Sequence, residues 1–105
     1  MSIPAVMRAI IPKNGECILT ECPVPTPTPG QVLLRVHASA LNRADTLQRG
    51  GKYPPPPGES DILGLECVGE VISEGGEKFK AGARVMSLLA SGGYAEYVAV
   101  DERSA

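Results

Sequence analysis

Residues 31–38, with the sequence QVLLRVHA, carry the clearest structural pattern in this chain. Side chains there alternate between an apolar face and a mixed face with the period of two that is typical of a β-strand. The alternation therefore predicts a strand, the strongest in the sequence. The apolar face comprises Val32, Leu34, Val36 and Ala38, and the other face comprises Leu33, Arg35 and His37.

Glycine and proline divide the rest of the chain into short segments. Further strands are predicted at 5–11, 17–22, 67–73, 84–89 and 94–100, with Gly69 interrupting the third of these. The turn signal Lys13-Asn14-Gly15 predicts that the first two form a hairpin. The proline-rich segment 23–30 excludes helix and central strand and favours an extended connector.

One short helix is predicted at 42–49. Asn42 is a suitable N-cap, Asp45 lies near the positive end of the helix dipole, and Gly50 is a suitable stop. About six short strands and one helix indicate a mainly β, α+β domain, a compact barrel of 105 residues.

Composition and charge exclude several classes of protein. The net charge is −2, no basic stripe occurs, and the chain has one Phe, three Tyr and no Trp, so nucleic acid is not an expected partner. No apolar run reaches the roughly 20 residues that span a bilayer, so no membrane is expected either. Three cysteines, an odd number, favour a reducing, cytoplasmic compartment over a disulfide scaffold.

Neither a nucleotide-binding loop nor a metal site is expected in this sequence. It contains no G-x-G-x-x-G turn and no P-loop. Cys17 and Cys22 should face opposite sides of one strand, Cys67 should be a small core residue, and His37 should be solvated. No set of ligands that could bind zinc emerges from these residues.

A polar cluster beside a proline-stiffened loop is the remaining candidate site: Asn42, Asp45, Gln48 and Tyr53. Purely structural roles are the preferred interpretation for Asp45 and Gln48. For Asn42 and Tyr53, a structural and a functional role remain about equally open. An amide and a phenol beside the rigid loop Pro54–Gly58 could bind a carbonyl oxygen at little ordering cost.

The order of segments resembles the medium-chain dehydrogenases/reductases, in particular the zinc-free NADPH:quinone oxidoreductase branch and its tumour-suppressor-inducible subgroup. The resemblance covers nearly the whole chain. The stretches that carry it are GQVLLRV (30–36), ASALNRAD (38–45), QRGGKYPPPPG (48–58), ILGLECVGEV (62–71) and GGYAEY (92–97).

This resemblance implies that residues 1–105 form an N-terminal, GroES-like substrate domain, a partly open β-barrel. It implies an NADPH-dependent reduction of a quinone or activated carbonyl by a full-length homodimer, with the cofactor bound mainly by a Rossmann domain that this chain lacks. By position, Asn42 would lie on the nicotinamide side, Tyr53 would be a donor or stacking wall for the quinone, and Asp45 would orient its neighbours. The chain alone should then be inactive.

Departures from the zinc-dependent relatives agree with a metal-free site. Asn42 and Leu65 match positions where those relatives have a Cys and a His ligand, and the four-cysteine zinc lobe has no counterpart. Ala83 stands where the family usually has Asp, which removes a turn-stabilising side chain. Two alternatives stay open: a non-enzymatic, co-chaperonin-like barrel, and an enone reductase or alcohol dehydrogenase-like enzyme.

Overall fold

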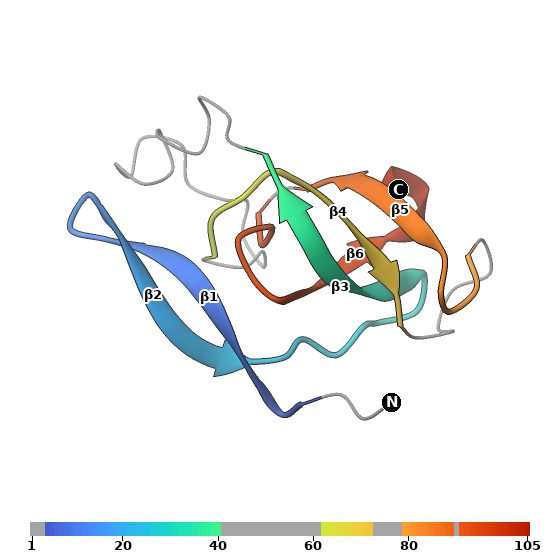
Figure 1. The fold of residues 1–105 in the computed structure, drawn as a ribbon, viewed down its shortest axis with the longest axis horizontal. Helices are drawn as coiled ribbons and strands as arrows, with labels where there is room; N and C mark the ends of the chain where they lie inside the picture. Colours follow the sequence, from blue (N-terminus) through green and yellow to red (C-terminus); the bar gives the residue numbers. More distant parts are fainter. Residues whose placement is uncertain (1–3, 41–61, 73–78, 90) are drawn as a thin grey trace.

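The computed structural model describes residues 4–40, 62–72, 79–89 and 91–105. Six strands occur in these ranges, in two antiparallel sheets of order β1-β2 and β5-β4-β3-β6 (Figure 1). This arrangement confirms the predicted mainly β, partly open barrel, while the helix predicted at 42–49 lies outside the described residues. The elements are β1 (Val6–Lys13), β2 (Glu16–Pro23), β3 (Gln31–Ser39), β4 (Glu66–Val71), β5 (Arg84–Leu88), β6 (Tyr97–Asp101) and the 3-10 helix η1 (Glu102–Ser104).

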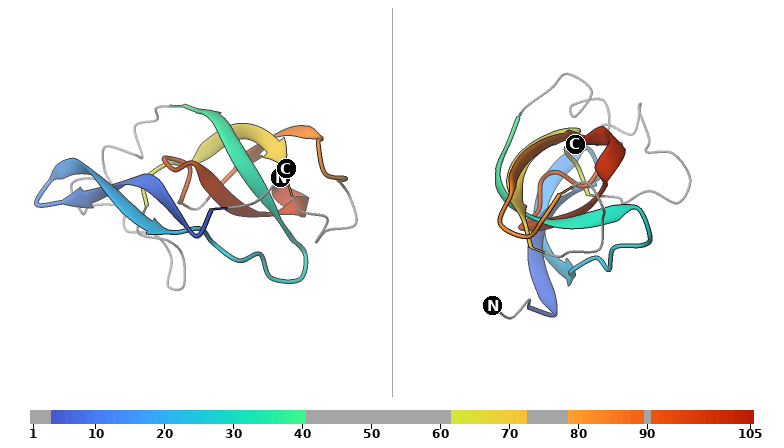
Figure 2. Two further views of the ribbon diagram at one scale, coloured as in Figure 1. Left: turned by 60° about the horizontal axis from the view of Figure 1, so that its bottom comes forward. Right: turned by 90° about the vertical axis from the view of Figure 1, so that its right-hand side faces the viewer.

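The hairpin β1-β2 forms as predicted around a two-residue turn. Asn14 and Gly15 have φ angles of 52° and 79°, and the residues that flank them, Lys13 and Glu16, pair directly. Positive φ at both central positions is the geometry that Asn-Gly favours, because it matches the twist of the flanking strands. Figure 2 shows the hairpin projecting from the curled four-stranded sheet.

Strand β3 lies at the centre of the larger sheet, between β4 and β6. Val32 and Leu34 have no exposed surface, as the alternation predicts. Leu33, on the opposite face, is also buried, and it lines a pocket together with residues of the proline-rich segment. The pairing with β4 shifts between Val36 and Ala38, so the predicted alternation ends at this bulge and Ala38 is exposed.

The core lies inside the curled four-stranded sheet and consists of buried side chains from β3, β4, β5 and β6. Cys67 belongs to it with 4% exposure, which confirms its predicted place. Burial raises the pKa of the Cys67 thiol to about 11, so this cysteine is an inert core group. Gly69 does not interrupt β4: a Cβ there would lie 2.6 Å from the carbonyl oxygen of Arg35, and the glycine permits this close approach of β3 and β4.

The strand predicted at 94–100 begins later than expected, at Tyr97. The three residues before it pair with the hairpin instead: Ala95 forms a bridge with Ala9, and Ile10 N donates to the oxygen of Tyr94 over 2.8 Å. This segment therefore leaves one sheet and joins the other, which holds the two sheets together. In the part of the chain that the structure describes, no helix has the length and apolar character to cross a membrane.

Glu96 strengthens this junction. Its Oε1 accepts a hydrogen bond from the backbone N–H of Arg8 at 2.6 Å, and its Oε2 lies 3.3 Å from the guanidinium of the same residue. These hydrogen bonds hold the pKa of the Glu96 carboxyl below its ordinary value of 4.5. Because the folded chain gives up this proton at lower pH than the unfolded chain, the contact adds stability above the ordinary pKa and loses it as the pH falls.

We therefore expect Glu96→Gln to reduce the pH dependence of unfolding between pH 6 and about pH 3, as linkage requires. The urea midpoint of the native chain should fall more over this range than that of the variant. Glu16→Gln is the control, since Glu16 is an exposed glutamate next to the hairpin turn. Equal pH dependence in native chain and Glu96→Gln would show that the Arg8 contact does not form in solution.

Candidate functional site

The three predicted site residues, Asn42 beside the nicotinamide, Tyr53 beside the quinone and Asp45 orienting its neighbours, all lie in the segment 41–61, outside the described residues. Gln48 lies there too. The structure describes the two ends between which this segment runs, Ala40 after β3 and Ile62 before β4. The described part of the site is therefore the group of residues that hold these two ends in place, and we call this group the frame.

One loop contacts both ends of the segment. In this Ser91–Glu96 loop, the hydroxyl of Tyr94 donates to the oxygen of Ala40 over 3.3 Å, and the oxygen of Gly93 accepts from the Ser39 hydroxyl. The N–H of Gly92 donates to the oxygen of Ile62 over 2.8 Å. The end of β3 and the start of residues 62–65 are thus anchored to the same few residues.

Close backbone contact between the loop and residues 63–64 requires glycine. The N–H of Tyr94 donates to the oxygen of Leu63 over 2.7 Å, and the N–H of Gly93 donates to the oxygen of Gly64 over 3.1 Å. Gly64 has a φ of 112°, and a Cβ there would lie 2.6 Å from the nitrogen of Tyr94. Any side chain at position 64 would therefore push the Ser91–Glu96 loop away from residues 63–64.

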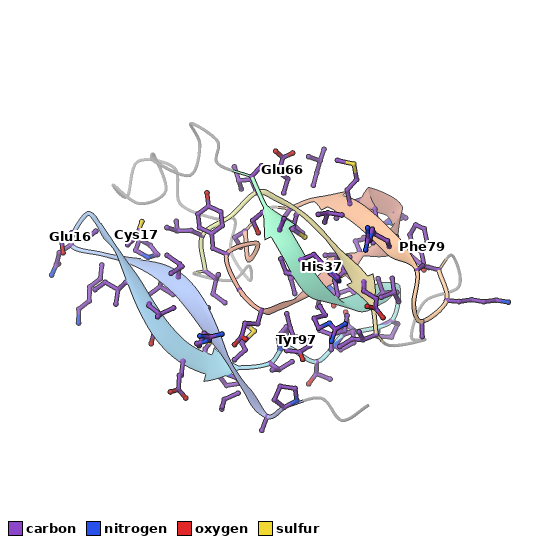
Figure 3. The ribbon with its side chains drawn as sticks, in the orientation of Figure 1. Glu16, Cys17, His37, Glu66, Phe79 and Tyr97 are labelled. Atoms are coloured by element: carbon purple, nitrogen blue, oxygen red, sulfur yellow. The ribbon has the colours of Figure 1, made fainter. Side chains whose placement is uncertain are left out.

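The second position compared with zinc-dependent relatives, Leu65, is half-buried at the end of the same stretch. Its backbone oxygen accepts from the N–H of Leu89 over 2.7 Å, and a leucine side chain has no atom that binds a metal. Glu66, which is labelled in Figure 3, follows it at the start of β4. It pairs with Leu88 of β5. Across the described ranges, no three His, Cys, Asp or Glu side chains gather as a metal site would need.

His37 is exposed, as predicted. Its Nε2 lies 3.9 Å from Oε1 of Glu70, the same oxygen that the Arg35 guanidinium approaches to 3.0 Å. The three side chains form a surface cluster on the outer face of β3 and β4. The surroundings of His37 are those of a solvated histidine rather than a metal ligand.

Ser91 is a candidate that the sequence does not reveal, since it lies in a Ser-Gly-Gly segment between the strands predicted at 84–89 and 94–100. It is 7% exposed, and its hydroxyl has no hydrogen-bond partner within the described residues. A buried polar group without a partner costs roughly 1–3 kcal/mol, so the position is unusual for a structural serine. No local signal in the sequence distinguishes this serine from a solvated turn residue.

Comparisons with known proteins agree with this architecture. The alcohol dehydrogenase GroES-like domain family matches residues 28–105. The rat synaptic vesicle membrane protein VAT-1 homolog is 46% identical over 78 residues, which cover 72% of this chain and 19% of that protein. Human quinone oxidoreductase is 45% identical over 82 residues, which cover 70% of this chain and 23% of that protein.

Among solved structures, the quinone oxidoreductase from Thermus thermophilus, described together with its complex with NADPH, is similar with a TM-score of 0.72 and 35% identity. The alignment covers 93% of this chain and 30% of that one. The chain thus spans about a fifth of the two curated relatives and under a third of this enzyme. The matched segments include the frame described above, and the chain belongs to the alcohol dehydrogenase GroES-like domain family of the medium-chain dehydrogenases/reductases.

Proposed function

We propose that this chain is the substrate domain of an NADPH-dependent oxidoreductase that reduces quinones or other activated carbonyl compounds without zinc. The supporting observation is the likeness to quinone oxidoreductases, one of them known in complex with NADPH. Asn42 and Leu65, at the two positions where zinc-dependent relatives have ligands, favour a metal-free site. The complete enzyme would be a cytoplasmic homodimer.

The residues of this chain would form only a small part of the NADPH-binding site. Within the ranges that the structure describes, the helical element is the three-residue η1, so these ranges offer no helix N-terminus of the kind that holds a pyrophosphate. The nucleotide would therefore be held mainly by a Rossmann domain, with Asn42 on the nicotinamide side. When bound, NADPH supplies the hydride.

The work of this chain would be to bind and polarise the acceptor. The Tyr53 hydroxyl would donate a hydrogen bond to the carbonyl oxygen on which negative charge develops, and Asp45 would orient the neighbouring side chains without taking protons. A quinone is already electron-poor, so a hydrogen bond can replace the Lewis acid that zinc relatives use. The Ser91–Glu96 loop would hold both ends of the segment that carries these groups.

A substrate panel tests this proposal in the complete enzyme that contains the domain. We expect the highest kcat/KM for ortho- or para-quinones, with lower values for α,β-enones and simple aldehydes, measured as NADPH oxidation. The chain alone serves as the control: it should show no turnover and no NADPH binding at micromolar concentration. A preference for enones would instead favour an enone reductase, and micromolar NADPH binding to the chain alone would contradict the division of roles.

A further inference from the structure

A pocket of about 470 Å³ lies between the hairpin β1-β2 and strand β6. Figure 3 shows Tyr97 in this region, between the hairpin and the larger sheet. The volume is in the range of pockets that bind small molecules. Its lining includes Met7, Ile11, Cys22, Ile62, Ser91 and Tyr97.

The hairpin presents an uncharged face to this pocket. Met7 pairs with Cys22, and side chains alternate along both strands, so Met7, Ile11, Thr20 and Cys22 lie on the same face. Glu21 also borders the pocket, but its side chain belongs to the opposite, exposed face of β2. An ionic ligand would find no countercharge on this face of the hairpin, whereas a neutral apolar molecule would replace water favourably.

Thr20, Ser91 and Tyr97 bring hydroxyl groups to the pocket lining, and among them the buried one without a partner is that of Ser91. Ser91 is 7% exposed, and its hydroxyl has no partner within the described part of the chain. A buried hydroxyl in a mainly apolar lining is stabilised when it donates to an incoming acceptor. A carbonyl oxygen can accept this hydrogen bond without bringing a further donor into the pocket.

We propose that this pocket binds an uncharged, largely apolar small molecule with a carbonyl oxygen that accepts a hydrogen bond from Ser91. The site requires neither Asn42, Asp45 nor Tyr53, and it does not rest on the proposed hydride transfer. Its lining comes from the hairpin, from β6 and from the residues around Ile62 and Ser91.

The three cysteines allow an internal test with the chain itself. Cys22 is half-buried and lines the pocket, Cys17 is exposed on the opposite face of the same strand, and Cys67 is buried in the core. The rate of alkylation by iodoacetamide, followed for each cysteine by peptide mass spectrometry, reports occupancy at Cys22. α-Tetralone is the probe, and tetralin, of similar shape without the carbonyl, is its matched control.

We expect saturating α-tetralone to slow alkylation of Cys22 several-fold and to leave that of Cys17 unchanged. Tetralin should bind about tenfold more weakly, the size expected for one hydrogen bond to a buried hydroxyl. Ser91→Ala should abolish the difference between ketone and hydrocarbon. Ser87→Ala is the control variant, because the Ser87 hydroxyl is buried but already donates to Leu88 and Ser104.

Three results would overturn the proposal. The first is no protection of Cys22 at millimolar α-tetralone, and the second is equal protection of Cys17 and Cys22. The third is equal affinity for ketone and hydrocarbon in the native chain. Urea unfolding of Ser91→Ala establishes that the variant is folded. A second readout, which does not depend on a cysteine, is the change in the NMR chemical shifts of Met7 and Tyr97 when α-tetralone is added.

Discussion

Gly64→Ala should destabilise the chain by about 3 kcal/mol or more, the largest effect that we expect from any single methyl group. Two costs combine. A φ of 112° is unfavourable for alanine, and the added Cβ would lie 2.6 Å from the nitrogen of Tyr94 and 2.7 Å from the Cα of Gly93. Both neighbours are backbone atoms, so relief requires the whole Ser91–Glu96 loop to move. Small domains have a total stability of roughly 5–15 kcal/mol, so a loss of about 3 kcal/mol would remove roughly a fifth to three fifths of it.

Gly30→Ala separates the two costs. Gly30 has a φ of 86°, yet a Cβ there would meet no atom within 4 Å. This variant should lose only the strain of the positive φ, about 1–2 kcal/mol. Urea unfolding of both variants, followed by circular dichroism, measures the difference. Equal losses would mean that the close approach of Gly64 to the loop is absent in solution.

Tyr53→Phe should lower kcat/KM for quinone reduction by about tenfold to a hundredfold in the complete enzyme, under the function proposed here. This range corresponds to the roughly 1.5–3 kcal/mol of a hydrogen bond to a group that gains charge. The loss should appear in kcat rather than KM, because the negative charge on the carbonyl oxygen develops in the transition state. Asn42→Ala should have an effect of similar size and should also raise KM for NADPH.

Gln48→Ala is the matched control for this pair, since a solvated structural role is the preferred interpretation of Gln48. Its kcat/KM should stay within about twofold of the native value, as expected for a surface substitution. If Tyr53→Phe and Asn42→Ala were equally silent, the site would not consist of these residues.

Local chemistry explains which parts of the fold could be predicted. The Asn14-Gly15 turn and the alternation in 31–36 act over a few residues, and both features have the predicted form. Burial of Leu33 depends on the proline-rich segment that borders it, and the late start of β6 depends on pairing between Ala95 and Ala9. Contacts between residues far apart in sequence leave no periodic signal in either segment.

The same distinction applies to the site. Glycine at 64 could be recognised from the family pattern, but the reason for it, a contact with residues 93 and 94, appears only in the folded chain. Ser91 likewise borders a pocket together with residues of the hairpin and of β6, an arrangement that no local signal reveals. The assignments of Asn42, Asp45 and Tyr53 come from resemblance and stay predictions, because these residues lie outside the described ranges.

Under the proposed function, the domain prepares a carbonyl acceptor for hydride without a metal. The decisive measurement is the zinc content of the purified complete enzyme together with its NADPH-dependent quinone reduction, before and after dialysis against a chelator. We predict substoichiometric zinc and an unchanged rate after dialysis. Stoichiometric zinc whose removal abolishes the reaction, and whose return restores it, would contradict the claim.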